Sequence, residues 1–338
     1  MHLHLQGAIA SPILFCFYMD NLFYILKRSG SGCMISNFYA GVHGYADDLL
    51  FLCPSRGGLQ EMLDIASKYV EEHKISFSTN PVPSKSKTKG IIFSDRKLRF
   101  SPAPIILNGN PLPWVEKAKY LGNKMTGILD GYAADVREKR AQFIERNCEL
   151  NQEFSSAHPE VKNRINRIYN SSFPGSVLWD LTAHNTKMII NSWSVAVRHM
   201  WGLPFNAHKY LIEKLSGTHA STMLMLRYVK FIQSIKKSPK LAVQFLYQKI
   251  HKNVNTVTGK NVAFTLQATG CTKMEDINVR EAKKKMVFSE MNEADEWKVD
   301  FIKEIVNIKH KVLFLDEDGE VGFDNDDLED IVDFLSTS

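Results

Sequence analysis

Cysteine is scarce in this sequence, and its five copies lie far apart, with no Cys-x-x-Cys pair and no Cys/His spacing typical of zinc sites. An odd, scattered set of cysteines excludes a disulfide framework and is typical of a reducing, intracellular compartment. No run of apolar residues approaches the ~20 that a membrane-spanning helix needs, so we expect no membrane partner. Residues 1–19 have no charged side chain, but they also lack the basic leader of a signal peptide, and Gln6 and Ser11-Pro12 interrupt the apolar run. We therefore expect a protein of the nucleus or cytoplasm that is not secreted.

Basic residues are absent from one end of the chain. From Val312 onward there is no Lys or Arg, whereas ten of the 37 Asp and Glu lie there. The 27 other acids face 42 Lys and Arg in residues 1–311, an excess of 15 bases. Such an excess favours a polyanionic partner, of which nucleic acid is the commonest. In Asp316-Glu317-Asp318-Gly319 the glycine comes too early for an EF-hand loop, so calcium binding is not expected.

The first 125 residues alternate between helical and extended patterns. Hydrophobic spacing and turn residues predict helices at 11–28 and 57–74, and extended runs at 33–42, 49–53, 75–78, 88–94, 105–107 and 112–121. Ser11-Pro12 supplies an N-cap and an N1 proline for the first helix. Asn108-Gly109 is typical of a hairpin turn. This order predicts an α+β fold with an antiparallel sheet and packed helices.

After Gly131 the pattern becomes helical. Expected helices cover 133–154, 160–169, 185–200, 207–215, 221–236, 241–252, one or two segments within 281–311, and a short acidic segment at 325–335. The aromatic residues Trp193, Trp201 and Tyr210 are expected in the core of this part. We divide the chain into three regions at 1–126, 127–255 and 256–338.

The clearest chemical signal is Tyr45-Ala46-Asp47-Asp48 between two apolar runs. Magnesium prefers hard oxygen ligands and binds any one carboxylate weakly, so its sites gather several acids. Two such ions about 3.5–4 Å apart clamp the attacking and leaving oxygens in phosphoryl transfer. A tight turn would present Asp47 and Asp48 together at the rim of a sheet. An isolated Asp-Asp pair in a turn is otherwise a solvated turn pair.

Four blocks in order carry a resemblance. They are Gln6-Gly7-Ala8-Ile9-Ala10-Ser11-Pro12-Ile13-Leu14-Phe15, Tyr45-Ala46-Asp47-Asp48, Ser84-Lys85-Ser86-Lys87-Thr88-Lys89 and Lys119-Tyr120-Leu121-Gly122. Together they resemble the reverse transcriptase of non-LTR (LINE-type) retrotransposons, in its QGxxxSPxLF, YADD, lysine-bearing and YLG blocks. The resemblance implies the C-terminal part of such an enzyme: an incomplete reverse-transcriptase palm, then a mostly helical thumb and a C-terminal extension.

The resemblance also implies roles for single residues. Asp47 and Asp48 would be catalytic ligands of Mg²⁺. The incoming nucleotide would lie near Gln6, Gly7, Tyr45 and Lys87, with Tyr45 also near the primer terminus. Lys85 is the alternative to Lys87 beside the departing pyrophosphate. A lysine run of this kind is otherwise a solvated loop that touches phosphate nonspecifically.

Further contacts would be made to an RNA template paired with a DNA primer. Tyr120, Leu121 and Gly122 would grip the primer end, although a simple strand end is the alternative. The backbone of the hybrid would be followed by basic residues: Lys85, Lys89, Lys139, Arg140, Arg146, Lys162, Arg164 and Arg167. An A-like hybrid is recognised by shape and phosphate. Any one of these residues is otherwise a charged outer face of a helical bundle.

The sequence departs from the family in one important respect. The family has a third aspartate on a strand before the QGxxxSP block, whereas Gln6 here is preceded by five residues, and the fingers are absent as well. Leu5 and Ala8 stand where the family usually has Arg and Gly. We therefore expect a polymerase fragment that is inactive alone, because catalytic groups that act as a unit fail together. A non-catalytic basic nucleic-acid-binding module, or the product of a decayed element, is the alternative.

Overall fold

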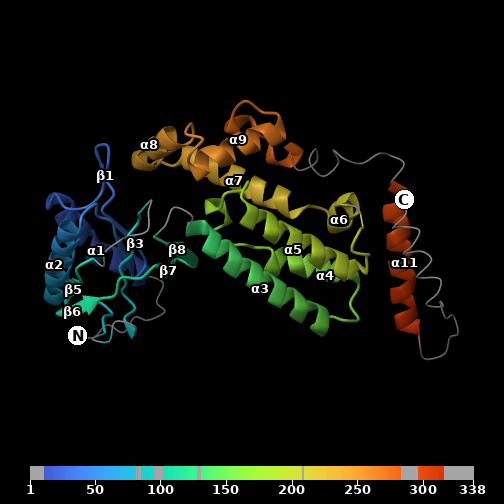
Figure 1. Cartoon of the computed structure of the whole chain (residues 1–338), viewed down its shortest axis with the longest axis horizontal. Helices are drawn as coiled ribbons and strands as arrows, with labels where there is room; N and C mark the ends of the chain where they lie inside the picture. The colour runs from blue at the N-terminus through green and yellow to red at the C-terminus, as the bar shows by residue number, and fades with distance from the viewer. Residues whose placement is uncertain are drawn as a thin grey trace. The chain divides into compact units, whose positions relative to one another are not determined.

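The computed structural model divides the chain into two compact units (Figure 1). Unit 1 comprises Met1–Ala118 with Thr126–Leu129, and unit 2 comprises Lys119–Met125 with Asp130–Ser338. The structure describes residues 11–80, 82, 85–94, 102–127, 131–207, 209–282 and 296–315. Within these residues the chain is mostly helical with small antiparallel sheets, which is compatible with the expected α+β class.

Two helices form the core of unit 1. They are α1 (Ser11–Arg28) and α2 (Arg56–Glu72), close to the expected bounds, and both predictions are confirmed. Ser55 caps α2, where its side chain accepts a hydrogen bond from the backbone N–H of Gly58 at 3.1 Å. The helices pack through buried apolar residues, namely Met19, Leu22 and Leu26 of α1 with Met62, Ala66, Tyr69 and Val70 of α2.

The strands form separate hairpins. The pairs are β1 (Met34–Ile35) with β2 (Phe38–Tyr39), β3 (Val42–Tyr45) with β4 (Asp48–Phe51), β5 (Ile105–Leu107) with β6 (Asn110–Leu112), and β7 (Lys117–Tyr120) with β8 (Asn123–Thr126). The predicted turn at Asn108-Gly109 is confirmed, and both residues have positive φ. The single antiparallel sheet that we expected is not formed by the described residues. The expected run 33–42 is broken by a turn at Ser36, whose φ is 53°.

Two expected strands are also absent from the described part of unit 1. Residues 75–80 and 88–94 form no regular strand. They are joined by a hydrogen bond from the Thr88 N–H to the Ser78 carbonyl at 3.3 Å, and an isolated bridge pairs Gly90 with Trp114. The chain therefore runs extended here without a ladder partner over most of its length.

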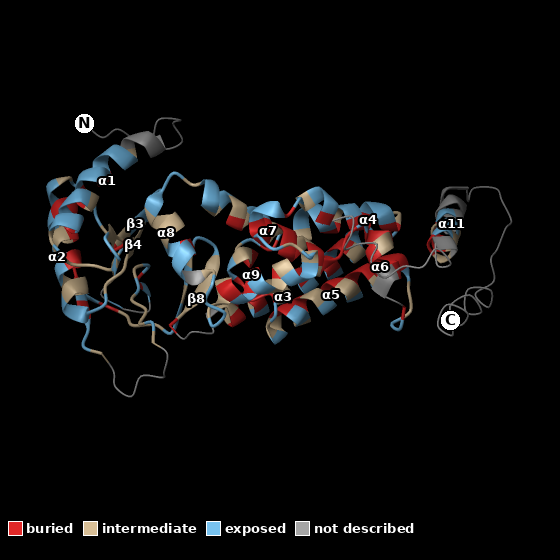
Figure 2. Ribbon diagram, turned by 90° about the horizontal axis from the view of Figure 1, so that it is seen from above, coloured by how far each residue is buried: buried red, intermediate tan, exposed pale blue. Residues whose placement is uncertain are grey.

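Unit 2 is built from helices around one core. The helices are α3 (Gly131–Glu153), α4 (Pro159–Ile165), α5 (His184–Trp201), α6 (Lys209–Ser216), α7 (Ala220–Lys237), α8 (Leu241–Ile250), α9 (Val257–Thr269) and α11 (Glu296–Leu315). Buried residues of α3, α5 and α7 face one another (Figure 2), and Phe143, Trp193 and Val229 belong to the same cluster. Trp193 and Trp201 are buried, as expected, whereas the side chain of Tyr210 lies outside the described residues.

Two expectations for unit 2 need correction. The expected helix 160–169 ends as α4 at Ile165 and continues as one π-helical turn, η2 (Asn166–Asn170). Helix α9 was not predicted, because its buried face is largely polar or small: Gly259, Asn261, Val262 and Thr265.

The expected acidic helix at 325–335 and residues 283–295 of the expected 281–311 segment lie outside the described residues. No described helix is both long and apolar enough to cross a bilayer.

Candidate active site

The paired aspartates lie at the tip of the β3–β4 hairpin. Tyr45 pairs with Asp48, which leaves Ala46 and Asp47 as a two-residue turn. Ala46 adopts a positive φ of 51°, a conformation that costs an L residue about 1 kcal/mol or more. Asp47 and Asp48 are exposed, and so is Tyr45, which is 65% exposed. The predicted hairpin with Asp47 and Asp48 at its tip is therefore confirmed.

The hairpin rests on α1. A Cβ at Gly44 would lie 2.7 Å from Cζ of Phe23, so only glycine allows the strand to approach this ring without a shift. Val42, Leu49 and Phe51 pack against the core shared by α1 and α2. The buried arm of the hairpin thus fixes the position of a solvent-exposed tip.

The tip of the β3–β4 hairpin offers some of the ligands that a hard cation needs. Asp47 and Asp48 offer carboxylate oxygens, the donors that Mg²⁺ prefers. Within the described residues, however, no group of three or more His, Cys, Asp or Glu is placed to hold a metal ion. Gln6 and Gly7, the expected nucleotide contacts, lie outside the described residues. The hairpin therefore supplies two donors of a site whose remaining ligands are not among the described contacts.

In the lysine run, exposed lysines alternate with hydroxyl residues that bond to the backbone. The buried Ser86 donates its hydroxyl hydrogen to the Thr88 carbonyl at 2.9 Å, and Thr88 donates its own to the Ser78 carbonyl at 3.0 Å. The alternate residues Lys85, Lys87 and Lys89 are exposed. The hydroxyls thus bind the backbone while the ammonium groups face solvent. No described contact joins these lysines to Asp47 or Asp48, so their roles stay predictions.

The expected primer-contacting turn is a tight hairpin. Leu121 and Gly122 connect β7 and β8 with φ values of 46° and 79°, and both residues are exposed. The expected extended run 112–121 is thus divided between the end of β6 and β7, and the contact of the β7–β8 turn with a primer stays a prediction. Tyr120 is half-buried.

Helix α3 holds this hairpin through three side chains. The buried Asp135 accepts a hydrogen bond from the Lys124 backbone N–H at 2.9 Å, and Glu138 pairs with the Lys124 ammonium at 2.7 Å. Lys139 donates to the Gly122 carbonyl at 3.3 Å. The Lys124 hydrogen bond lowers the pKa of Glu138, because it stabilises the ionised carboxylate. Sequence reasoning missed Asp135 and Glu138, although two acids one helical turn apart directly after a turn motif are a recognisable signal.

The other basic residues of unit 2 divide into two groups. Arg140 donates from Nε to the Ser192 hydroxyl at 2.8 Å and so joins α3 to α5. Lys162 is buried and donates to the Ser155 carbonyl, which leaves little of it for an external phosphate. Arg146 and Arg164 are exposed. The structure thus gives Arg140 and Lys162 internal contacts, while backbone binding by any of these residues stays a prediction.

The first part of the chain is similar to a known protein family. Residues 4–125 match the family model described as reverse transcriptase (RNA-dependent DNA polymerase), which covers just over a third of the 338 residues. The match includes the β3–β4 hairpin with Asp47 and Asp48 and most of the β7–β8 hairpin. It supports the assignment of this segment to a reverse transcriptase. No curated protein sequence gives a significant match to the chain.

Proposed function

We propose that this chain is the C-terminal part of a LINE-type RNA-directed DNA polymerase, with palm, thumb and C-terminal regions at 1–126, 127–255 and 256–338. The observation that carries the proposal is the pair Asp47 and Asp48 at the tip of the β3–β4 hairpin, within the segment that matches reverse transcriptases. The five cysteines are free, in keeping with an intracellular protein.

Asp47 and Asp48 act as ligands of Mg²⁺. When bound, the ions stabilise the charge that develops on the attacking and leaving oxygens in nucleotidyl transfer. Ala46 and Gly44 hold the two carboxylates on a short turn against α1. The exposed ring of Tyr45 borders the primer end, and Lys87 faces the phosphates of the nucleotide, beside Gln6 and Gly7.

The β7–β8 hairpin contacts the primer through Tyr120, Leu121 and Gly122. The exposed turn is fixed on α3, so its approach to a strand depends on the first turns of that helix. The hybrid of RNA template and DNA primer is held by its phosphates, with the exposed Lys85, Lys89 and Arg164 as contacts. Lys139 and Arg140, which already donate to Gly122 and Ser192, contribute through their remaining N–H groups.

A binding module without catalysis is the second candidate function, and one observation favours it. Between Glu213 and Glu275 the sequence has no acidic residue but ten Lys and Arg. Lys230 and Lys237, which are exposed and two helical turns apart on α7, belong to this segment. Such a surface binds a phosphate backbone without base specificity.

The 338 residues alone are expected not to extend a primer. The hairpin provides two carboxylates, and Asp20 of α1 is the only other acid in residues 1–60. A two-metal centre that lacks an acidic ligand loses charge neutralisation and positioning at once.

Two measurements on the full chain test these statements. The first is primer extension on an RNA template with Mg²⁺ and dNTPs, in which extension that disappears in Asp47→Asn would disprove inactivity. The second is Mn²⁺ binding by electron paramagnetic resonance, in which Asp47→Asn and Asp48→Asn should each weaken binding at least tenfold.

Asp64→Asn is the matched control, because Asp64 is an exposed carboxylate on α2 of the same unit. Equal Mn²⁺ affinity in all variants would refute the assignment of metal ligands to the hairpin.

A further inference from the structure

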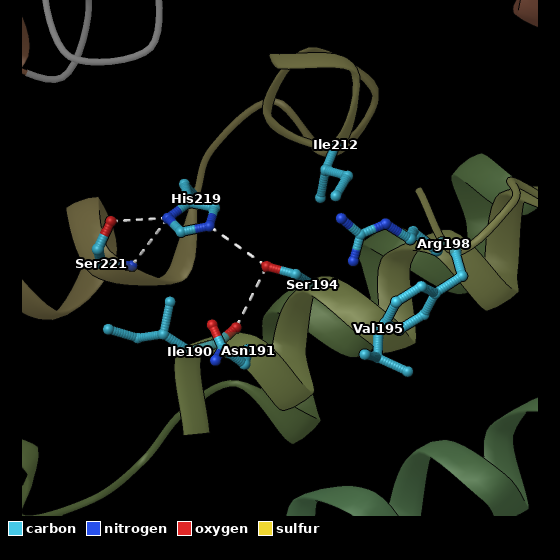
Figure 3. Close-up of a pocket in the computed structure, with 9 residues that line it drawn as sticks. Ile190, Asn191, Ser194, Val195, Arg198, Ile212, His219 and Ser221 are labelled. Carbon is cyan, nitrogen blue, oxygen red and sulfur yellow. Dashed lines mark hydrogen bonds between the residues drawn. The ribbon is translucent and has the colours of Figure 1, made fainter. Parts of the chain in front are cut away.

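A cavity of about 490 Å³ opens between α5, α6 and the start of α7 in unit 2 (Figure 3). Its volume lies in the range of small-molecule sites. Polar groups reach it from Asn191, Ser194 and Arg198 of α5 and from His219, which precedes α7. Ile212 of α6 forms part of an apolar wall. All of these residues belong to unit 2, whereas Asp47 and Asp48 belong to unit 1.

The guanidinium of Arg198 is a cation that lacks compensation within the described structure. One of its terminal nitrogens donates to the Ala207 carbonyl at 3.1 Å, but its Nε is buried without a hydrogen-bond partner. Burial lowers the pKa of Arg198, and no described carboxylate pairs with it. Figure 3 shows the guanidinium extending between Ile212 and Ser194. Arg198 is half-buried and lines the cavity, so an anion there would supply the charge partner that its guanidinium lacks.

His219 and Ser194 form a polar wall of the cavity. Its Nδ1 accepts hydrogen bonds from the Ser221 hydroxyl at 2.6 Å and from the Ser221 backbone N–H at 3.3 Å. The neutral ring therefore carries its proton on Nε2, which faces the Ser194 hydroxyl at 3.4 Å. Because His219 donates a hydrogen bond to Ser194, it cannot act as the base that would activate this serine as a nucleophile. The Ser194 hydroxyl in turn donates to the Ile190 carbonyl at 3.2 Å, so both side chains form a polar wall whose hydrogens are already bonded inside the protein.

The start of α7 favours an anion in the cavity. His219 is its N-cap, and Ser221 lies in its first turn. The N-terminus of an 18-residue helix carries a partial positive charge that favours anions. Glu213 opposes this effect, since its Oε1 lies 3.9 Å from Nδ1 of His219, on the side of the ring away from Ser194.

An aromatic ring lies at the rim. Phe205 is 86% exposed, and the centre of its ring lies 6.0 Å from the guanidinium carbon of Arg198. An exposed ring beside a cation offers a stacking face next to a phosphate subsite, the combination that binds nucleotides in single-strand-binding proteins.

We propose that this cavity binds the phosphate of a nucleotide, with Arg198 on the phosphate and Phe205 against the base or sugar. The nucleotide is either free or the phosphorylated end of a strand, because both present the same group. The site goes beyond the polymerase function and requires neither a metal ion nor the carboxylates of unit 1.

Isothermal titration of the full chain with AMP, adenosine and inorganic phosphate tests the proposal. We expect AMP to bind at least tenfold more tightly than adenosine, and Arg198→Gln to weaken AMP binding at least tenfold. Lys187→Gln is the matched control, because Lys187 is exposed on the same helix outside the cavity and should leave binding unchanged.

Phe205→Ala is a second variant that should fold normally, because the side chain of Phe205 is almost fully exposed. This variant should weaken AMP binding several-fold without changing the binding of inorganic phosphate. A 5′-phosphorylated oligonucleotide that competes with AMP, compared with the unphosphorylated strand, assigns the site to a strand end, and failure to compete assigns it to a free nucleotide. Absence of AMP binding by the folded chain, or equal affinity in the wild type, Arg198→Gln and Phe205→Ala, would overturn the proposal.

Discussion

Asp135 accepts a hydrogen bond from the indole N–H of Trp179, with 2.8 Å between Oδ2 and Nε1. Its other oxygen accepts the backbone N–H of Lys124 at 2.9 Å. One buried carboxylate of α3 therefore joins the β7–β8 hairpin to the 3-10 turn η3 (Ser176–Leu178), which ends at Trp179. The position of the predicted primer-contacting turn depends on this residue.

Replacement of Asp135 should destabilise unit 2. Asp135→Ala leaves the buried indole N–H of Trp179 and the partly buried backbone N–H of Lys124 without an acceptor, and each unsatisfied buried donor costs about 1–3 kcal/mol. We expect the free energy of unfolding to fall by at least about 2 kcal/mol, measured by urea denaturation. Lys124→Met is the control, because it keeps the backbone N–H and removes only a partly exposed ion pair, worth about 0–1 kcal/mol. Equal losses in the two variants would contradict the role of Asp135.

The close approach of Gly44 to Phe23 predicts coupling between these residues. Gly44→Ala should lower the free energy of unfolding by about 1–3 kcal/mol, because the added methyl group meets the ring. Gly44→Ala combined with Phe23→Leu should recover part of this loss in a double-mutant cycle. Gly57→Ala is the control, since nothing lies near a Cβ there and alanine favours the first turn of α2. Strict additivity of the two substitutions would show that the ring does not restrict the strand.

The ion pair of Glu138 with Lys124 predicts a pH dependence. The pKa of Glu138 is lowered in the folded state, so its contribution to stability is present above the unfolded pKa and is lost as pH falls through the folded pKa. Both side chains are about one-third exposed, at 37% for Lys124 and 32% for Glu138, and the contribution is therefore about 1 kcal/mol or less. Glu138→Gln should lower stability at neutral pH and make no difference in strong acid. A difference that is the same at both pH values would exclude this ion pair as the cause.

The exposed lysines of α7 and the start of α8 predict salt-dependent binding of nucleic acid. Lys237→Glu with Lys240→Glu should weaken the binding of an RNA–DNA hybrid at low salt and reduce the dependence on salt concentration by about one unit of slope per lost phosphate contact. Fluorescence anisotropy at several salt concentrations measures both quantities. Lys68→Glu, an exposed position on α2, is the control for net charge. An unchanged slope in the double variant would place the binding surface elsewhere.

Local patterns predicted many elements of this fold. Helix α2 follows from the spacing of Met62, Ala66 and Tyr69, and helix α1 follows from Ser11-Pro12 at its start, because these signals lie within a few residues of one another. The turns at Asn108-Gly109 and at Ala46-Asp47 follow from turn residues between apolar runs. Helix α9 shows where such reasoning ends: its buried Asn261 bonds to the backbone of Leu181 and Trp179, about 80 residues earlier. No periodicity of apolar residues marks a face that is buried through hydrogen bonds.

The sequence by itself determined the order of motifs, the helices with an apolar stripe and the turn that presents Asp47 and Asp48, because each depends on neighbours in the chain. Only the tertiary structure decided which charged residues are available for a ligand. Lys162 and Arg140 read as equivalent to Arg164 in the sequence, yet two of them are used inside the fold and one is exposed. The same holds for Arg198, whose unpartnered nitrogen depends on segments that come together only when α5, α6 and α7 pack. The physical reason is that burial and pairing of a charge depend on contacts distant in sequence, whereas the propensity for a turn or a helix is local.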